Sequence, residues 1–155
     1  MWASAPLELE QVRERLARHA ADFAAGREYI MAITDRGTGE VHGGAGLHRR
    51  RGPNALEVGY WLRTTSQGQG FATEATAALT RWAFEAHPIR QVQLRCDPNN
   101  LASVRLAQRL GYVHRTTLKQ IFEMPDGRWC DSAIYSIRRD DWGPKHVAWR
   151  PLESG

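Results

Sequence analysis

Apolar side chains recur at helical spacing in two long segments and one short segment of the chain. In residues 7 to 25 they are Val12, Leu16, Ala20 and Phe23, and in residues 71 to 86 they are Phe71, Ala75, Leu79, Trp82 and Ala86. Because an α-helix turns once in about 3.6 residues, each set lies on one face and predicts an amphipathic helix. A shorter helix is expected over residues 101 to 110, where Gly111 follows at the position that favours a left-handed residue.

Apolar runs between these helices predict strands. Residues 28 to 33 and 40 to 48 flank the turn-rich segment DRGTG and predict a hairpin. Two further strands are expected over residues 55 to 62 and 91 to 96, and two more on either side of the PDG turn at 125 to 127. Three glycines weaken the second hairpin strand and indicate a bulge or a close backbone approach: Gly43, Gly44 and Gly46.

The order of these elements predicts an α+β fold in which helices flank a mixed sheet. The chain of 155 residues is long enough for one domain with its own core. No internal repeat or low-complexity tract divides it. We therefore expect residues 1 to 155 to form a single domain.

Charge and cysteine content narrow the function classes. The formal net charge of +4 occurs without a long basic run, so it suits an anionic small ligand at least as well as a nucleic acid. For Arg49 to Arg51, a solvated turn and a phosphate contact both stay open. Cys96 and Cys130 are too far apart for a CxxC motif, and the histidines lack metal-ligand spacing, so no metal site is expected.

The chain also lacks membrane signals. No apolar run approaches the roughly 18 residues that a membrane span requires, and no basic segment followed by an apolar stretch opens the chain. Two cysteines without a disulfide pattern suit a reducing compartment. These features predict a soluble cytoplasmic protein that binds neither membrane nor nucleic acid.

The stretch SQGQGFATEATAAL, residues 66 to 79, places a glycine loop between a strand and a helix. Free amides and the helix dipole make such a helix start an anion site, although glycines can also serve the turn alone. A P-loop requires a lysine after the last glycine, and none follows Gly70. A dinucleotide fingerprint requires a third glycine where Thr73 stands.

The segment QGQGFA, residues 67 to 72, matches the Q/R-x-x-G-x-G/A signature of the GCN5-related N-acetyltransferases. The flanking GYWL and ATEA resemble the RimJ/RimL branch of that family, and DPNNLASVRLAQRLGY extends the likeness. The resemblance covers residues 29 to 137. It implies a mostly antiparallel central sheet flanked by helices, acetyl-CoA as co-substrate, and direct acetyl transfer to a primary amine of a protein N-terminus or a small molecule.

The resemblance also implies which residues contact acetyl-CoA. The pyrophosphate is expected on the amides of Gly68 to Ala72, and the thioester carbonyl on an amide between Tyr60 and Leu62. The expected contact residues are Tyr60, Trp61, Leu62, Gln67, Gly68, Gln69, Gly70, Phe71, Ala72, Thr73, Asn100 and Ser103. Glu74 is expected to be a partner of the helix dipole or of a salt bridge.

Two side chains are catalytic candidates. Relatives often carry a glutamate on the strand before the loop that takes the amine proton through water, which makes Glu57 the candidate base; an exposed edge charge is the alternative. Ser103 is the candidate proton donor or hydrogen-bond partner of the thiol, while helix capping alone also explains Asn100 and Ser103. Neither cysteine is needed as a nucleophile.

Two departures from the family pattern keep alternatives open. Many relatives have a tyrosine acid where this chain has Ala107, so solvent is an alternative proton source for the thiolate. The segment MWASAP is too short for the strand and helix that usually come first, so the acceptor pocket is expected to be open there or completed by a second subunit of a homodimer. A catalytically weak CoA-binding regulatory module is the alternative function.

Overall fold

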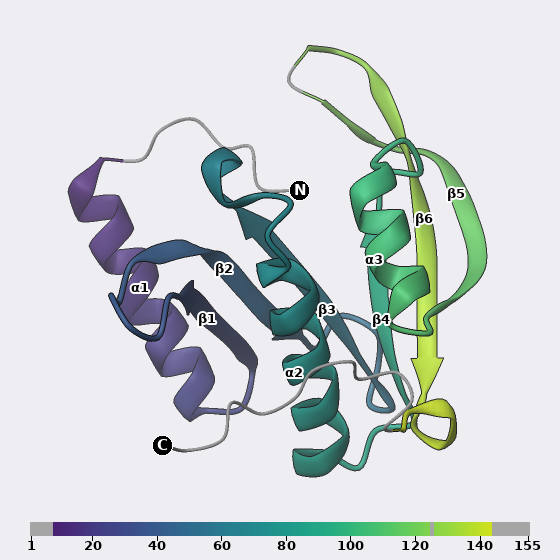
Figure 1. The fold of residues 1–155 in the computed structure, drawn as a ribbon, viewed down its shortest axis with the longest axis horizontal. Helices are drawn as coiled ribbons and strands as arrows, with labels where there is room; N and C mark the ends of the chain where they lie inside the picture. The colour runs from purple at the N-terminus through teal and green to yellow at the C-terminus, as the bar shows by residue number, and fades with distance from the viewer. Residues whose placement is uncertain (1–7, 125, 144–155) are drawn as a thin grey trace.

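The computed structural model describes residues 8–124 and 126–143, and these contain one sheet with helices on both sides (Figure 1). The helices are α1 (Leu9–Ala24), α2 (Phe71–Ala86) and α3 (Leu101–Arg109). The strands are β1 (Glu28–Thr34), β2 (Val41–His48), β3 (Ala55–Leu62), β4 (Gln91–Cys96), β5 (Val113–Glu123) and β6 (Trp129–Arg138). Short 3-10 turns, η1 and η2, lie at Thr64–Ser66 and Arg139–Asp141.

Within the described residues the strand order is β1-β2-β3-β4-β6-β5. The β3–β4 pair is parallel and the other neighbouring pairs are antiparallel. The predicted α+β class and mostly antiparallel sheet are therefore confirmed. Of the predicted PDG turn, Pro125 lies outside the described residues. The core is formed by apolar side chains that alternate along the central strands, including Leu47, Leu56, Val58 and Leu94.

The buried face of α2 differs from the predicted one. Its buried residues are Thr76, Ala77, Leu79, Thr80, Ala83 and Phe84, and Ala86 is exposed. Small side chains let the helix approach the sheet closely, whereas the larger Trp82 is only partly buried beside the core. The apolar pattern therefore located the helix correctly and three residues of its predicted face, Ala75, Leu79 and Trp82, do contact the core, but the most buried face is rotated toward Thr76, Thr80 and Ala83.

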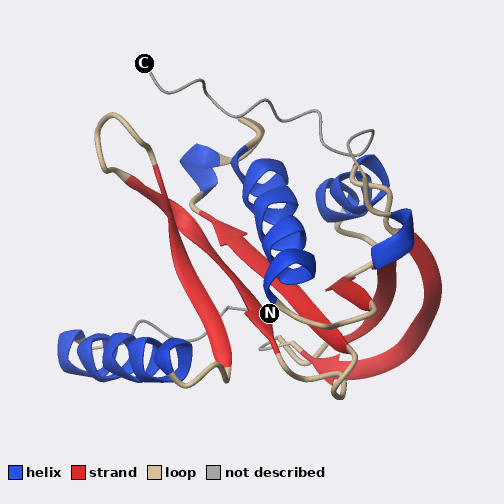
Figure 2. Ribbon diagram, turned by 90° about the horizontal axis from the view of Figure 1, so that it is seen from below, coloured by secondary structure: helices blue, strands red, loops and turns tan. Residues whose placement is uncertain are grey.

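Helix α1 is amphipathic as predicted, but none of its described residues is buried. Figure 2 shows it on the side of the sheet opposite α2. Its C-terminal end is held by Phe23, whose ring packs edge-on against Tyr29 at 5.4 Å and stacks with Trp82 at 6.3 Å. Leu16 stays 61% exposed, so burial of the whole apolar stripe is not what fixes this helix.

Strand β2 has both predicted features, a close backbone approach at Gly43 and a bulge at the neighbouring His42. A Cβ on Gly43 would lie 2.1 Å from the carbonyl oxygen of Trp61, which is a collision with backbone. The β1–β2 register shifts between Ile33 and Thr34, so His42 is an extra residue on β2. Schellman hydrogen bonds end α3, because Gly111 adopts a φ of +77° and the amide of the following residue donates to a carbonyl inside the helix.

The two parallel central strands separate partway along their length. Pairing between β3 and β4 runs from Ala55 opposite Gln91 to Val58 opposite Leu94. Beyond that point β3 continues along β2, and β4 continues along β6 to Cys96. Figure 1 shows the resulting divergence of the two strands. The backbones of the second halves of β3 and β4 are therefore not paired with each other, and the region between them is called the opening.

Candidate functional site

Backbone amides of β3 point into this opening. The amide of Arg63 donates to the carbonyl of His42 on β2 at 2.9 Å. Since backbone groups alternate in direction along a strand, the amide of Trp61 also points to β2. The amides of Tyr60 and Leu62 point the other way, past the end of the β3–β4 pairing. Two donors of the predicted segment therefore face the opening, and the donor of Trp61 does not.

The glycine loop leads from β3 into an uncapped helix start. Gly68 and Gly70 adopt φ values of +75° and +92°, which glycine reaches without steric cost. Gly70 is the N-cap of α2, and no side chain caps it. The first intrahelical bond runs from the amide of Glu74 to the carbonyl of Gly70. The amides before Glu74 therefore have no acceptor within the helix, which makes this end of α2 favourable for an anion.

The space above both loop glycines is open. A Cβ on Gly68 or Gly70 would meet no described atom within 4 Å. The loop itself is braced, because Gln69 donates from its side chain to the carbonyl of Thr65 at 2.9 Å. The ring of His42 stacks on Phe71 at 4.2 Å and lies within hydrogen-bond distance of Ser66. A side chain at position 68 or 70 would thus be disfavoured by the positive φ of the backbone and not by a clash with neighbouring protein atoms.

On the α2 and α3 side of the opening, Tyr60 contacts Ser103. The Tyr60 hydroxyl donates to Ser103 Oγ at 2.9 Å, and the Ser103 amide donates to Asn100 Oδ1 at 3.1 Å. The predicted capping role of Asn100 is confirmed. Burial raises the pKa of Tyr60, although its bond to Ser103 acts in the opposite direction. Tyr60 therefore stays a donor at neutral pH, and Ser103 keeps its own proton for another acceptor.

Cys96 ends β4 beside the same opening. Burial, assisted by the charge of Asp97, raises the pKa of its thiol to about 11. Both cysteines are free thiols in the described structure. Near neutral pH the Cys96 thiol is therefore protonated and weakly nucleophilic.

Glu57 lies on the opposite side of the sheet and is only 9% exposed, so the alternative of an exposed edge charge is wrong. Its Oε2 accepts from Arg51 Nε at 2.7 Å, and Arg51 Nη2 forms an ion pair with the same oxygen at 2.6 Å. Arg95 Nε lies 3.6 Å from the same oxygen. The other oxygen, Oε1, has a longer contact of 3.9 Å with Arg50 Nη1. Oε1 therefore has fewer close contacts with these arginines than Oε2 has.

Sequence reasoning did not assign Arg51 or Arg95 to the site. Arg51 binds Glu57 instead of extending into solvent, while Arg49 donates to the carbonyl of Gly26 at 2.7 Å. Arg95 alternates with apolar residues in QVQLRC, a signal that it faces away from the core. The loop position of Arg51 gave no comparable signal, because only folding brings it to β3.

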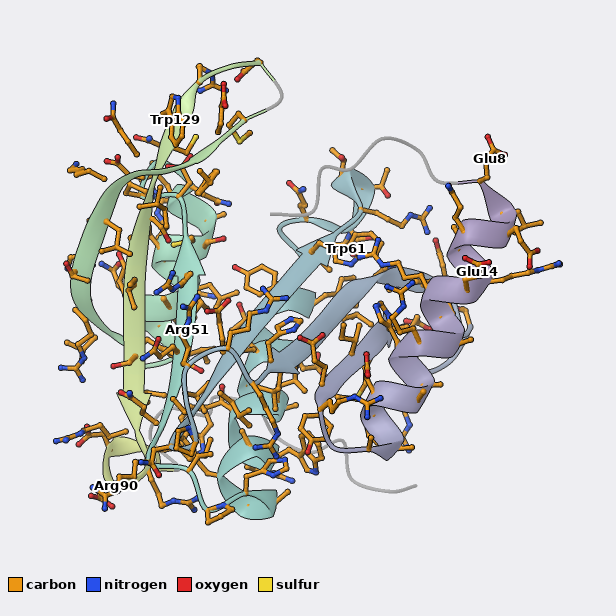
Figure 3. All side chains as sticks on the ribbon, turned by 180° about the vertical axis from the view of Figure 1, so that it is seen from behind. Glu8, Glu14, Arg51, Trp61, Arg90 and Trp129 are labelled. Atoms are coloured by element: carbon orange, nitrogen blue, oxygen red, sulfur yellow. The ribbon has the colours of Figure 1, made fainter. Side chains whose placement is uncertain are left out.

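Figure 3 shows the side of the sheet that carries Trp61 and Arg51. Alternation along β3 places Glu57, Gly59 and Trp61 on this side, and Tyr60 and Leu62 on the other. Trp61 is 44% exposed and its indole lies against Gly44. The predicted residues thus divide between two sides of one opening: loop and Ser103 on the helical side, Glu57 and the Trp61 ring on the other.

A separate hollow of about 720 Å³ lies at the far end of the sheet, around the turn after α2. Figure 3 marks this end with Arg90. Arg139 lines the hollow and donates to the carbonyl of Ile89 at 3.0 Å and to that of His87. These bonds satisfy carbonyls around the end of α2, so the arginine has a structural role.

No three His, Cys, Asp or Glu side chains gather as a metal site within residues 8–124 and 126–143. The helices of this part of the chain include none that is long and apolar enough to cross a membrane.

Residues 1–113 match the profile of a family described as Acetyltransferase (GNAT) domain. The chain is 26% identical over 92 residues to the uncharacterized N-acetyltransferase YnaD of Bacillus subtilis, covering 59% of this chain and 53% of that protein. It thus spans about half the length of this relative. The [Ribosomal protein uS5]-alanine N-acetyltransferase of Escherichia coli is 26% identical over 121 residues, covering 77% of this chain and 62% of that protein.

Solved structures show the same fold. A probable acetyltransferase superposes with a TM-score of 0.84 at 22% identity, covering 92% of this chain and 78% of the other. RimL, a ribosomal L7/L12 alpha-N-protein acetyltransferase in complex with coenzyme A, superposes with a TM-score of 0.78 at 23% identity. That match covers 87% of this chain and 75% of RimL.

Proposed function

Because the chain belongs to the family of acetyltransferase (GNAT) domains, we propose that it transfers the acetyl group of acetyl-CoA to a primary amine. The observation that carries the proposal is the opening between β3 and β4. There the amides of Tyr60 and Leu62 lack a β4 partner, close in sequence to the uncapped start of α2. Acetyl-CoA is an extended ligand that needs hydrogen-bond donors at two places, at its thioester carbonyl and at its pyrophosphate.

The glycine loop is proposed to hold the pyrophosphate. The amides of Gly68 to Thr73 supply donors, and the open space above Gly68 and Gly70 fits a ligand that lies close to backbone. The Gln67 amide donates to the carbonyl of Thr64 and the Gln69 side chain to that of Thr65, which shapes the loop, and Asn100 caps the start of α3. The fold match to RimL, whose structure contains coenzyme A, supports this assignment.

The residues around the opening suit direct transfer. Acetyl-CoA would supply the activated acetyl group as a thioester. Glu57 is proposed to accept the amine proton through water at Oε1, and the amides of Tyr60 and Leu62 to stabilise negative charge on the carbonyl oxygen. Ser103 is proposed to pass its proton to the departing thiolate while the Tyr60 hydroxyl, which donates to Ser103 Oγ, replaces that proton.

Two measurements test this function. Thiol release is followed with acetyl-CoA and a panel of N-terminal peptides, polyamines and other small amines, and the melting temperature is recorded with and without acetyl-CoA. The proposed function predicts both turnover and stabilisation. Stabilisation without turnover would favour the weak CoA-binding module. The absence of both stabilisation and turnover would contradict the proposal. Activity is expected to be insensitive to EDTA.

A further inference from the structure

Three arginines gather beside the opening, on the side of the sheet that carries Glu57. Arg50, Arg51 and Arg95 all lie within 4.0 Å of its carboxylate. Glu28 is the second acidic residue of the group and lies 3.9 Å from Arg50. Three guanidinium groups thus face two carboxylates. His48, which lies 3.2 Å from Glu28, is not included in this count. The group has an excess of positive charge.

Arg95 is the arginine of this group whose buried Nε lacks a hydrogen-bond partner among the described residues. Glu57 Oε2 is already bound by two nitrogens of Arg51, and Arg95 reaches that oxygen only at 3.6 Å. Burial and the charge of Arg51 lower the pKa of Arg95, against the opposite effect of Glu57. A guanidinium in this setting gains from a second carboxylate.

The position of Arg95 decides where that carboxylate would come from. Arg95 is the first residue of β4 beyond the last pair with β3, Leu94 opposite Val58. On β3, Gly59 stands between Glu57 and Trp61 on the same side and adds no side chain. The Trp61 indole lies against Gly44, so it is turned toward β2. The surface between Trp61 and the arginines therefore leads to the opening.

We propose, on the basis of the function proposed above, that the acceptor is an amine with a carboxylate a few bonds away. Arg95, supported by Arg51, binds the carboxylate, and this places the amine near Oε1 of Glu57. Two sources share this chemistry: a peptide whose first residue is acidic, and a free amino acid. Glu57 then has two functions, since its Oε2 orients the arginines while Oε1 faces the amine.

Two matched acceptor pairs test the proposal. The peptides Asp-Ala-Ala amide and Asn-Ala-Ala amide differ in the side-chain carboxylate, and alanine and alaninamide differ in the α-carboxylate. We expect kcat/KM to favour the acidic member of at least one pair by roughly tenfold to hundredfold, the usual value of a hydrogen bond to a charged group. The pair that shows the preference identifies the source.

Three variants locate the effect. Arg95→Gln should erase the preference, so that the acidic and neutral members of the pair have equal kcat/KM, and its melting temperature reports whether the variant is folded. Arg95→Lys should retain part of it because the charge remains. Arg90→Gln is the matched control, an exposed arginine at the far end of the sheet (Figure 3), and should leave the preference unchanged.

Equal kcat/KM within both pairs, or a preference that survives in Arg95→Gln, would overturn the proposal. Failure of the proposed function is distinguishable, because it appears as absence of thiol release with every acceptor. In that case the acetylated peptides N-acetyl-Asp-Ala-Ala amide and N-acetyl-Asn-Ala-Ala amide are compared by thermal shift. Stronger stabilisation by the acidic peptide, lost in Arg95→Gln, would support the carboxylate site, and equal stabilisation would overturn it.

Discussion

The two sides of the opening in the sheet use different chemistry. On the side of α2 and α3 the groups are neutral: backbone amides, the hydroxyls of Tyr60 and Ser103, and a protonated thiol. On the other side they are charged, with Glu57 held by arginines. One strand, β3, supplies both sides because its side chains alternate in direction. Backbone donors can hold a cofactor with few specific side chains, whereas recognition of an acceptor depends on side chains gathered from separate segments.

The largest expected effect tests the charged side. Glu57→Gln should lower kcat/KM on the order of a hundredfold to ten-thousandfold at neutral pH, where the acceptor amine is protonated and a base is needed. The deficit should shrink at high pH as solvent deprotonates the amine. The pH profile of kcat/KM is compared with that of Glu85→Gln, an exposed glutamate on α2. A deficit that is constant across pH would remove the base role from Glu57.

The next effect tests the loop on the neutral side. Acetyl-CoA at a hundred times its Kd should stabilise the parent by about 2.7 kcal/mol. Gly70→Glu should abolish this, since it places a carboxylate at the phosphate site. Gly39→Glu is the matched control, because Gly39 also has positive φ and open space around its Cβ position. Equal acetyl-CoA shifts in both variants would mean that the loop does not bind the phosphates.

The reactivity of Cys96 reports how strongly burial on the neutral side suppresses ionisation of its thiol. A pKa of about 11 instead of 9.0 means that the thiolate fraction at pH 8 is about a hundredfold smaller. Because the shift is upward, alkylation should accelerate with each pH unit up to about 11. The rate is measured by mass spectrometry in the Cys130→Ser background, and bound acetyl-CoA should slow it further. Modification of Cys96 as fast as free cysteine at neutral pH would contradict this picture.

The smallest effect concerns the hydrogen bond between Tyr60 and Ser103. Tyr60→Phe should lower kcat by about tenfold, because one hydrogen bond to a charge-bearing oxygen is lost. Ser103→Ala should lower kcat more, and Tyr60→Phe should add little in that background, since the acceptor is gone. Binding of acetyl-CoA is followed in parallel by thermal shift. Independent, additive effects of the two substitutions would separate Tyr60 from the proton transfer.

Local features of the sequence predicted most of the fold. Strand β3 and helix α2 have the predicted boundaries, because alternation and helical periodicity arise from short-range geometry. The cap by Asn100 and the left-handed Gly111 are equally local. The contact face of α2 was only partly predicted, since it depends on which side chains let the helix approach the sheet. The sequence left the exposure of Glu57 open for a similar reason, because the arginines around it come from a loop and from another strand.

The sequence by itself determined the helices and strands, the glycine loop and the family motifs, because each of these depends on residues that lie close together along the chain. Only the tertiary structure decided which amides of β3 face the opening, since this requires the point where β3 and β4 separate. It also decided that Arg51 and Arg95 meet at one carboxylate, although they are far apart along the chain. Interactions of this kind depend on distances in space, and for residues far apart along the chain these distances are set only by folding.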